Sequence, residues 1–264
     1  MTFKNIKVTT GAAVARISLY RPERLNSLDE ATMVELHTAV DRIADDPALR
    51  VLAITGEGRA FCAGQDLADP AMQIVEGELP DIGTHVERYF KPFVLKLQSL
   101  PIPTVAAVNG LAAGGGASIA LACDIVVAAK SAYFLQAFSR IGLTPDTGST
   151  WFLTHRVGMA RAMGLALFAD KLPAEKAAEW GLIWEVIDDA EFPAGIDALL
   201  ERIANMPTRA MVRTRQLMLA AAVHSLEEQL SMEATFIREL GWRHDYQEGV
   251  RAFSEKRPPN FRGI

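Results

Sequence analysis

The stretch from Val105 to Thr150 constrains this chain most, because it joins an apolar strand, three consecutive glycines and a helix start. Gly114, Gly115 and Gly116 lack a Cβ, so a backbone N–H there can come close to a ligand. The helix expected from Ala117 to about Ala122 turns unpaired N–H groups and its positive dipole end toward that ligand. Such a start favours a phosphate, an oxyanion or an enolate oxygen. Three glycines also suit a simple flexible turn.

A second small-residue loop lies upstream. Val51–Thr55 is a short apolar run bounded by turn residues, which indicates a buried strand. The segment AFCAGQDL follows, and its Ala63-Gly64 pair again lets the backbone approach a ligand. The N–H groups of Gln65 and Gly115 are therefore candidates to point at one carbonyl oxygen.

The two loops together carry a resemblance. AFCAGQDL followed by AVNGLAAGGG resembles the enoyl-CoA hydratase/isomerase (crotonase) family, and the likeness runs from RPERLNSL to EGVRAFSEKRPPNF. It implies an α/β fold, a crotonase-like stacked-sheet ββα spiral core with a C-terminal helical trimerisation region. The core would span residues 1–205, and residues 206–264 would serve oligomerisation and coenzyme A contact. It also implies an acyl-CoA thioester substrate, a homotrimer or dimer of trimers, and catalytic N–H donors at Gln65 and Gly115.

Both glutamates that hydratases of this family use are replaced. One would lie two residues after the third glycine, where this chain has Ser118. The other would follow a Gln-Pro pair, where this chain reads Gln136-Ala137-Phe138. Neither a serine nor a phenylalanine side chain titrates usefully near neutral pH, so neither acts as a general base there.

Asp146, in the run GLTPDTGST, is the remaining candidate acid/base. A lone Asp after Pro is ordinarily a turn residue or a helix cap. Members of the family that shift double bonds or handle aromatic acyl groups, however, can place a carboxylate at this point. One carboxylate beside a stabilised enolate can take a proton from one carbon and return it to another. Burial among Phe138, Leu143 and Trp151 is expected to raise the pKa of Asp146.

The resemblance is closest, over AFSRIGLTPDTGSTWFLTHRVGMARAMGLAL and AEKAAEWGLIWEVIDD, to members that isomerise a ring epoxide of phenylacetyl-CoA to oxepin-CoA. An acyl-CoA isomerase of that kind, or one performing a Δ3-Δ2 double-bond shift, is the first interpretation. A hydratase or lyase that uses Asp146 is the second. A non-catalytic, CoA-thioester-binding assembly subunit is the third.

Further substrate contacts follow from the family pattern. In RPERLNSL, Arg24 and Asn26 are candidates to contact coenzyme A, although an exposed arginine is often only solvated. Lys256, beside Arg257, matches a C-terminal basic pair that can reach a phosphate. The expected substrate-binding set also includes Ala63, Gly64, Asp66, Leu67, Gly114 and Phe138. Asp66 suits an alternative role, bracing its own loop.

Composition excludes several other classes. The 264-residue chain has a net charge of −5 and shows no basic stripe, which argues against nucleic-acid binding. No apolar run approaches the roughly 18 residues of a membrane span. Two cysteines and five scattered histidines show no metal-ligand spacing, so we expect no metal site and reduced thiols. The start Met1-Thr2-Phe3-Lys4 leads us to expect no signal peptide and a cytoplasmic location. No cofactor is expected beyond the coenzyme A of the substrate.

Periodicity predicts a strand-rich first part and a helical end. Ile6–Thr9 and Val14–Leu19 indicate a hairpin around Gly11, and Asp29–Asp45 a helix. The apolar strands VLAIT, TVAAV and DIVVAA recur between helices, which favours parallel pairing. From Pro173 onward the pattern is helical, and Asn205-Met206-Pro207 is the clearest boundary. The predicted helical segments there are AEKAAEWG, Glu191–Asn205, Thr208–His224 and Leu226–Leu240. A helix over Gly83–Leu97 is expected to place Tyr89, Phe90 and Phe93 in the acyl pocket or in the core.

Overall fold

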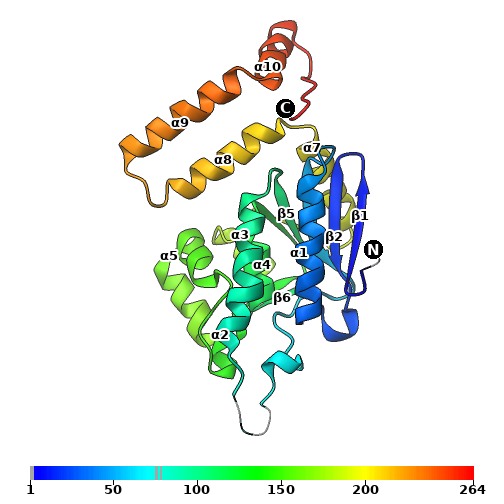
Figure 1. Ribbon diagram of the computed structural model, residues 1–264, viewed down its shortest axis with the longest axis vertical. Helices are drawn as coiled ribbons and strands as arrows, with labels where there is room; N and C mark the ends of the chain where they lie inside the picture. The colour runs from blue at the N-terminus through cyan, green and yellow to red at the C-terminus, as the bar shows by residue number, and fades with distance from the viewer. Residues whose placement is uncertain (1–2, 75–76, 78) are drawn as a thin grey trace.

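The computed structural model describes residues 3–74, 77 and 79–264, and its strands form two sheets (Figure 1). The larger sheet has the order β1-β2-β3-β5-β7-β10. Its strands are β1 (Ile6–Gly11), β2 (Val14–Leu19), β3 (Val51–Gly56), β5 (Thr104–Val108), β7 (Ile125–Ala129) and β10 (Glu185–Ile187). The smaller sheet, in the order β4-β6-β8-β9, consists of β4 (Ala60–Cys62), β6 (Leu111–Ala113), β8 (Tyr133–Leu135) and β9 (Leu172–Pro173).

The chain alternates between the two sheets as it winds. β3, β5 and β7 pair in parallel in the larger sheet, and each is followed directly by β4, β6 or β8 in the smaller one. β4, β6 and β8 are also parallel to one another. Each turn of the chain therefore adds one strand to each sheet, and a helical segment leads to the next turn. The stacked-sheet ββα spiral expected from the resemblance is confirmed.

Helices surround this spiral and continue beyond it. Those that precede the C-terminal region are α1 (Glu30–Asp45), α2 (Ile82–His85), α3 (Lys91–Ser99), α4 (Gly115–Ala122), α5 (Ser149–Phe168), α6 (Ala174–Glu179) and α7 (Phe192–Ala204). They are followed by α8 (Thr208–Ala220), α9 (Leu226–Gly241) and α10 (His244–Glu255), which extend away from the sheets in Figure 1. The sequence did not predict α10. The division of the chain after residue 205 stays a prediction.

Helix α1 shows how closely local signals match the structure. The Asp29 side chain caps it by accepting a hydrogen bond from the Thr32 N–H at 2.8 Å. The apolar positions at helical spacing, Met33, Leu36, Val40 and Ile43, are all buried. This helix therefore agrees with its prediction in both its bounds and its buried face.

Two local predictions are corrected. The turn of the first hairpin is Ala12-Ala13, with φ values of 47° and 74°, and not Gly11. Gly11 pairs with Val14, so only two residues close the loop, and such loops need positive φ at both positions. Helix α4 begins at Gly115, two residues before Ala117, because the second and third glycines already adopt helical geometry.

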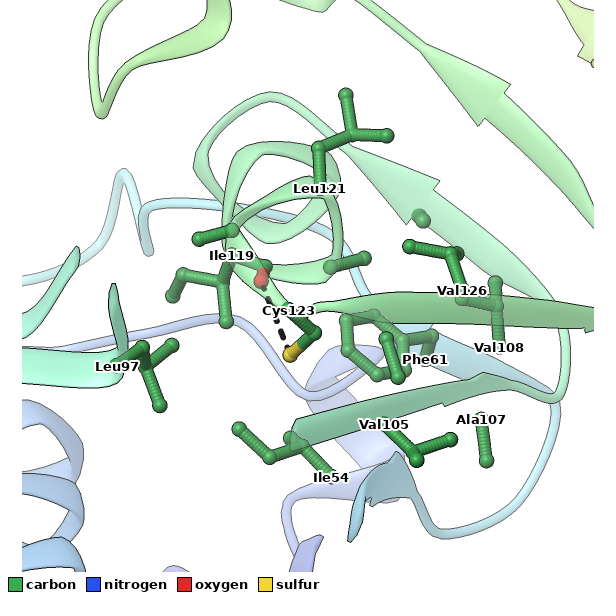
Figure 2. Close-up of a cluster of buried hydrophobic side chains, with 14 of the residues drawn as sticks. Ile54, Phe61, Leu97, Val105, Ala107, Val108, Ile119, Leu121, Cys123 and Val126 are labelled. Carbon is green, nitrogen blue, oxygen red and sulfur yellow. Dashed lines mark hydrogen bonds between the residues drawn. The ribbon is translucent and has the colours of Figure 1, made fainter. Parts of the chain in front are cut away.

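The core lies between the sheets and their helices, and both cysteines belong to it. Figure 2 shows Cys123 in a cluster of buried apolar side chains, with its thiol donating to the Ile119 carbonyl oxygen at 3.6 Å. Cys62 and Cys123 are free and buried. Burial raises the pKa of each thiol to about 12.

We expect neither thiol to react with a disulfide reagent such as DTNB in the native protein at pH 8. A pKa of about 12 leaves almost no thiolate, and burial blocks the reagent. Both should react fully once a denaturant unfolds the chain, which an absorbance assay measures. Rapid labelling of the native protein would contradict the buried placement.

In the part of the chain that the structure describes, no helix has the combination of length and hydrophobicity that spanning a bilayer requires. The first strand begins at Ile6, and Met1 and Thr2, which entered the expectation about a signal peptide, lie outside the described residues.

Candidate active site

The smaller sheet brings three loops together at one edge. The carboxyl ends of parallel strands lie at the same edge of a sheet, and β4, β6 and β8 are parallel. Residues 63–65 follow β4, Gly114 and Gly115 follow β6, and the segment 136–146 follows β8. A cavity of about 130 Å³ opens there, lined by Ala63, Gly64, Gln65, Leu67, Met72, Ile82, His85, Val86, Phe90, Gly114, Gly115, Ala137, Phe138, Ile141, Leu143 and Asp146.

Close backbone packing explains the glycines of the first two loops. A Cβ on Gly64 would lie 2.9 Å from the Ala113 carbonyl oxygen and 3.4 Å from the Gly115 nitrogen. Gly64 also has a φ of +92°, which side chains rarely allow. A Cβ on Gly116 would lie 2.6 Å from Cys62. The loops after β4 and β6 are thus in direct contact, and larger residues would separate them.

Two N–H groups at this contact are available to a ligand. The Leu28 backbone bonds to both neighbours of Gln65, with Leu28 N–H to the Gly64 oxygen at 2.8 Å and Asp66 N–H to the Leu28 oxygen at 2.9 Å. The Gln65 N–H takes part in neither of these hydrogen bonds. Gly115 is the first residue of α4, where N–H groups have no partner within the helix. Among the described residues, neither N–H has a hydrogen-bond partner. Their convergence on one carbonyl oxygen stays a prediction.

Asp146 lines the same cavity from the loop between β8 and α5. Burial raises the pKa of its carboxyl group, while a hydrogen bond from Thr147 and the nearby His85 act in the opposite direction. The Thr147 hydroxyl donates to Asp146 Oδ1 at 2.8 Å. Phe138 and Leu143 contribute to the apolar lining as predicted. Trp151 does not: it is 40 % exposed and stacks on His155, with ring centroids 4.1 Å apart.

The two positions that carry glutamate in hydratases hold no acid. Ser118 is fully buried, and its hydroxyl bonds to the Ser149 hydroxyl and to the Gly114 carbonyl oxygen, the latter at 3.1 Å. The Ser149 N–H donates to the Asp146 carbonyl oxygen at 2.9 Å, so this serine pair fixes the start of α5 behind the carboxylate. Asp146 is the only carboxylate among the described residues that line the cavity.

Comparison with known proteins agrees with this geometry. Residues 9–263 match the model of the enoyl-CoA hydratase/isomerase family. The chain belongs to this family. It is 45 % identical to 1,2-epoxyphenylacetyl-CoA isomerase of Escherichia coli (strain K12), over 95 % of both chains. It is also 45 % identical to a probable enoyl-CoA hydratase of Rhodobacter capsulatus, over the full length of both. The crystal structure of an enoyl-CoA hydratase from Bacillus anthracis superposes with a TM-score of 0.91, at 31 % identity over 99 % of this chain and 100 % of the other.

In this member of the hydratase/isomerase family, only some of the other predicted site residues line the cavity. Ala63, Gly64, Leu67, Gly114 and Phe138 line the cavity. Asp66 does not line it.

The Asp66 carboxylate accepts hydrogen bonds from the Ala68 N–H at 3.0 Å and from Arg21 at 2.8 Å. These bonds brace the loop and lower the pKa of Asp66 despite its burial. The structure thus supports the bracing alternative for this residue over contact with substrate.

Asn26 is also structural rather than ligand-binding. It is 1 % exposed, and its amide donates to the carbonyl oxygens of Glu57 at 2.9 Å and Ala60 at 2.8 Å. Its side-chain oxygen accepts from the Arg21 N–H at 2.9 Å. Every polar atom of the side chain is used, so the predicted contact with coenzyme A is corrected to a role in joining two loops.

The two basic residues predicted to contact coenzyme A lie outside the cavity. Arg24 and Lys256 are exposed, and neither side chain has a partner among the described residues. Arg257, in contrast, pairs with Glu248 at 2.6 Å and with Glu255 at 2.6 Å. Contact of Arg24 and Lys256 with a phosphate stays a prediction.

Sequence reasoning did not single out five lining residues, and only His85 among them is polar: Met72, Ile82, His85, Val86 and Ile141. His85 ends α2, directly before a π-helical turn over Val86–Phe90, and such turns are frequent at functional sites. Of the three aromatic residues predicted nearby, only Phe90 lines the cavity. The one available signal was a histidine one helical turn before Tyr89, in an otherwise apolar helix face.

Proposed function

We propose that this enzyme is an acyl-CoA isomerase that stabilises a thioester enolate. Its reaction would be the conversion of 2-(1,2-epoxy-1,2-dihydrophenyl)acetyl-CoA to oxepin-CoA, a Δ3-Δ2 double-bond shift, or both. The observation that carries the proposal is a cavity whose described residues include one carboxylate, Asp146, and two N–H groups without a partner, at Gln65 and Gly115. The relative from Escherichia coli named 1,2-epoxyphenylacetyl-CoA isomerase supports the choice of an aromatic acyl group.

In the double-bond shift, the thioester oxygen accepts hydrogen bonds from Gln65 and Gly115. The Asp146 carboxylate removes a proton from the carbon beside the carbonyl, and the electron pair moves into an enolate. The same carboxyl group then returns the proton at the far end of the double bond, so no water or second base is consumed. Removing one such donor costs roughly 2.7–4 kcal/mol in other enzymes.

For the epoxide, the same two donors polarise the thioester while the apolar walls hold the ring. We propose that neither reaction needs a metal or a cofactor, because coenzyme A arrives as part of the substrate. The reduced state expected for the two buried cysteines suits a cytoplasmic enzyme.

Hydration is the main alternative, and a side-by-side assay distinguishes it. Purified enzyme would be given a 3-enoyl-CoA and a 2-enoyl-CoA, with product formation followed by chromatography. We expect the double-bond shift to be much faster than water addition, because hydration needs acid/base groups at Ser118 and Phe138 that this chain lacks. Hydration as fast as isomerisation would favour the hydratase interpretation. A lack of turnover and of α-proton exchange would favour a binding subunit.

We further propose a homotrimer, or a dimer of trimers, formed through the C-terminal helices. None of the residues of α9 is buried. A set of large apolar side chains on α8 to α10 is exposed: Met218, Leu226, Leu230, Ile237, Tyr246, Val250 and Phe253. Soluble monomers rarely expose such a continuous apolar surface. Association through these helices would cover it.

Sedimentation velocity tests this assembly. We expect no stable monomer at micromolar concentration, and we expect Phe253→Asp to shift the protein toward smaller species, because Phe253 is 86 % exposed in the single chain. The exposed Trp184, outside these helices, provides the control Trp184→Asp, which should leave the assembly intact. A monomeric wild-type protein would contradict the proposal.

A further inference from the structure

Within the described part of the chain, two polar side chains of the cavity have buried atoms without hydrogen-bond partners. His85 is 6 % exposed, and its Nε2 atom has no hydrogen-bond partner. The side-chain amide of Gln65 is buried with both its oxygen and its nitrogen unpaired. Leaving a buried polar group unsatisfied costs about 1–3 kcal/mol. Two such groups lining one cavity indicate that a ligand supplies the missing hydrogen bonds.

The aromatic contacts connect His85 to Gly115 through Phe90. Its ring lies against Tyr89 and Phe90, with centroids 4.9 Å and 5.8 Å apart. Phe90 in turn approaches Gly115, since a Cβ on that glycine would lie 3.5 Å from the Phe90 ring. One aromatic ring therefore separates the Gly115 N–H from the imidazole. An acyl group whose carbonyl oxygen bound at Gly115 would share one cavity with Phe90 and His85.

The chemistry of the two side chains defines what they can recognise. An imidazole and an amide can both take part in hydrogen bonds with an oxygen. Together they suit a hydroxyl or ether oxygen on the acyl group. A purely hydrocarbon acyl group forms no hydrogen bond with the two side chains, so it does not replace the water that they lose when it binds. Sites built to hydrogen-bond an oxygen reject the analogue that lacks it.

We propose that His85 and the Gln65 amide form a subsite for an oxygen substituent on the acyl group, which makes the enzyme selective for oxygenated aryl-acetyl thioesters. This inference rests on the proposed function. It adds a specificity-determining role for two side chains, separate from the backbone N–H of Gln65. Asp146 keeps the proton-transfer role.

Binding of two unreactive thioesters tests the subsite. Isothermal titration of the full-length protein would compare 2-hydroxyphenylacetyl-CoA with phenylacetyl-CoA. We expect the wild type to bind the hydroxylated compound roughly 10-fold more tightly, the effect of one to two hydrogen bonds at about 0.5–1.5 kcal/mol each. His85→Leu should reduce this ratio to about one, mainly by weakening the hydroxylated ligand. Gln65→Leu should reduce it without removing a backbone donor.

The controls separate this inference from the proposed function. His155→Leu changes a histidine outside the cavity, which bonds the Trp151 carbonyl oxygen at 2.7 Å, and should leave the ratio unchanged. His85→Phe is the second variant if His85→Leu does not fold. Exchange of the α-protons of phenylacetyl-CoA with deuterium tests Asp146 and the N–H donors alone, since this ligand has no ring oxygen. Exchange of α-protons by the wild type, together with a ratio that is lost in the His85 and Gln65 variants and kept in His155→Leu, supports both proposals.

Two results would overturn the subsite. One is a wild-type protein that binds both thioesters equally. The other is a ratio that persists in both the His85 and Gln65 variants, which would mean that water satisfies these groups. A wild-type protein that keeps the ratio but exchanges no α-protons would instead refute the proposed isomerase and leave the subsite standing.

Discussion

Asp146→Asn is expected to slow α-proton exchange and double-bond isomerisation by roughly 10²–10⁴-fold, the usual contribution of a positioned acid/base. The amide cannot accept the proton, and no other carboxylate among the described residues lines the cavity. Binding of the thioester should persist, because the N–H groups of Gln65 and Gly115 are unchanged. Exchange of phenylacetyl-CoA in deuterated water measures the chemical step, and titration calorimetry measures binding.

The pH dependence of this step follows from the buried position of the carboxyl group. Burial raises its pKa above the ordinary value of 3.8, and only the ionised form is a base. The exchange rate should therefore rise with pH through an inflection above 3.8. Asp170→Asn, at an exposed acid, is the matched control and should change neither rate nor profile. A wild-type rate in Asp146→Asn would reduce Asp146 to a turn residue.

Stability provides a second readout for the same variant. Because the pKa of Asp146 is raised in the folded protein, its carboxyl group contributes fully to stability at a pH below the unfolded pKa. This contribution to stability is lost as the pH rises through the folded pKa. At a pH above the folded pKa, the charged group is therefore unfavourable in its buried site. Asp146→Asn should keep or raise the melting temperature there, so loss of activity with an unchanged or higher Tm would identify a catalytic defect.

Arg215→Met is expected to destabilise the protein by about 3–5 kcal/mol, the typical result of breaking a buried ion pair. The Arg215 side chain, on α8, is 6 % exposed and lies 3.0 Å from Asp124 at the start of β7. It also donates to the carbonyl oxygens of Leu97, Leu100 and Ile102. Without it, Asp124 keeps a buried charge. Burial already raises the pKa of the Asp124 carboxyl group, despite the nearby guanidinium. Denaturant unfolding at matched protein concentration measures the loss.

Arg16→Met is the control for this prediction. Arg16 pairs with Asp197, but the two side chains are 36 % and 65 % exposed, and such surface pairs contribute about 0–1 kcal/mol. We expect a loss below about 1 kcal/mol for it. Equal effects of the two substitutions would show that Arg215 is not the anchor that holds α8 to the spiral. Because α8 begins the helices proposed to form the trimer, Arg215→Met should also weaken assembly.

Sequence alone determined the elements whose signals are local. The apolar runs around Val51, Val105 and Val126 are buried parallel strands, as their continuous hydrophobicity predicted. The glycine loops and the missing glutamates were also evident, because family motifs are read residue by residue. The place of Asp146 in the cavity followed from its position in such a motif, and the direction of its pKa shift from the apolar residues around it.

Tertiary structure alone decided which side chains meet. His85 reaches the cavity because tertiary packing brings the end of α2 together with the loops that follow β4, β6 and β8, and no sequence spacing encodes that packing. Asn26 turned out to be structural, since the partners that satisfy its amide lie 31 and 34 residues away in the chain. Arg215 and Asp124 are 91 residues apart, and only packing buries them together. Local patterns specify strands, turns and helix faces, whereas long-range packing decides which polar atoms find partners and which stay free for a ligand.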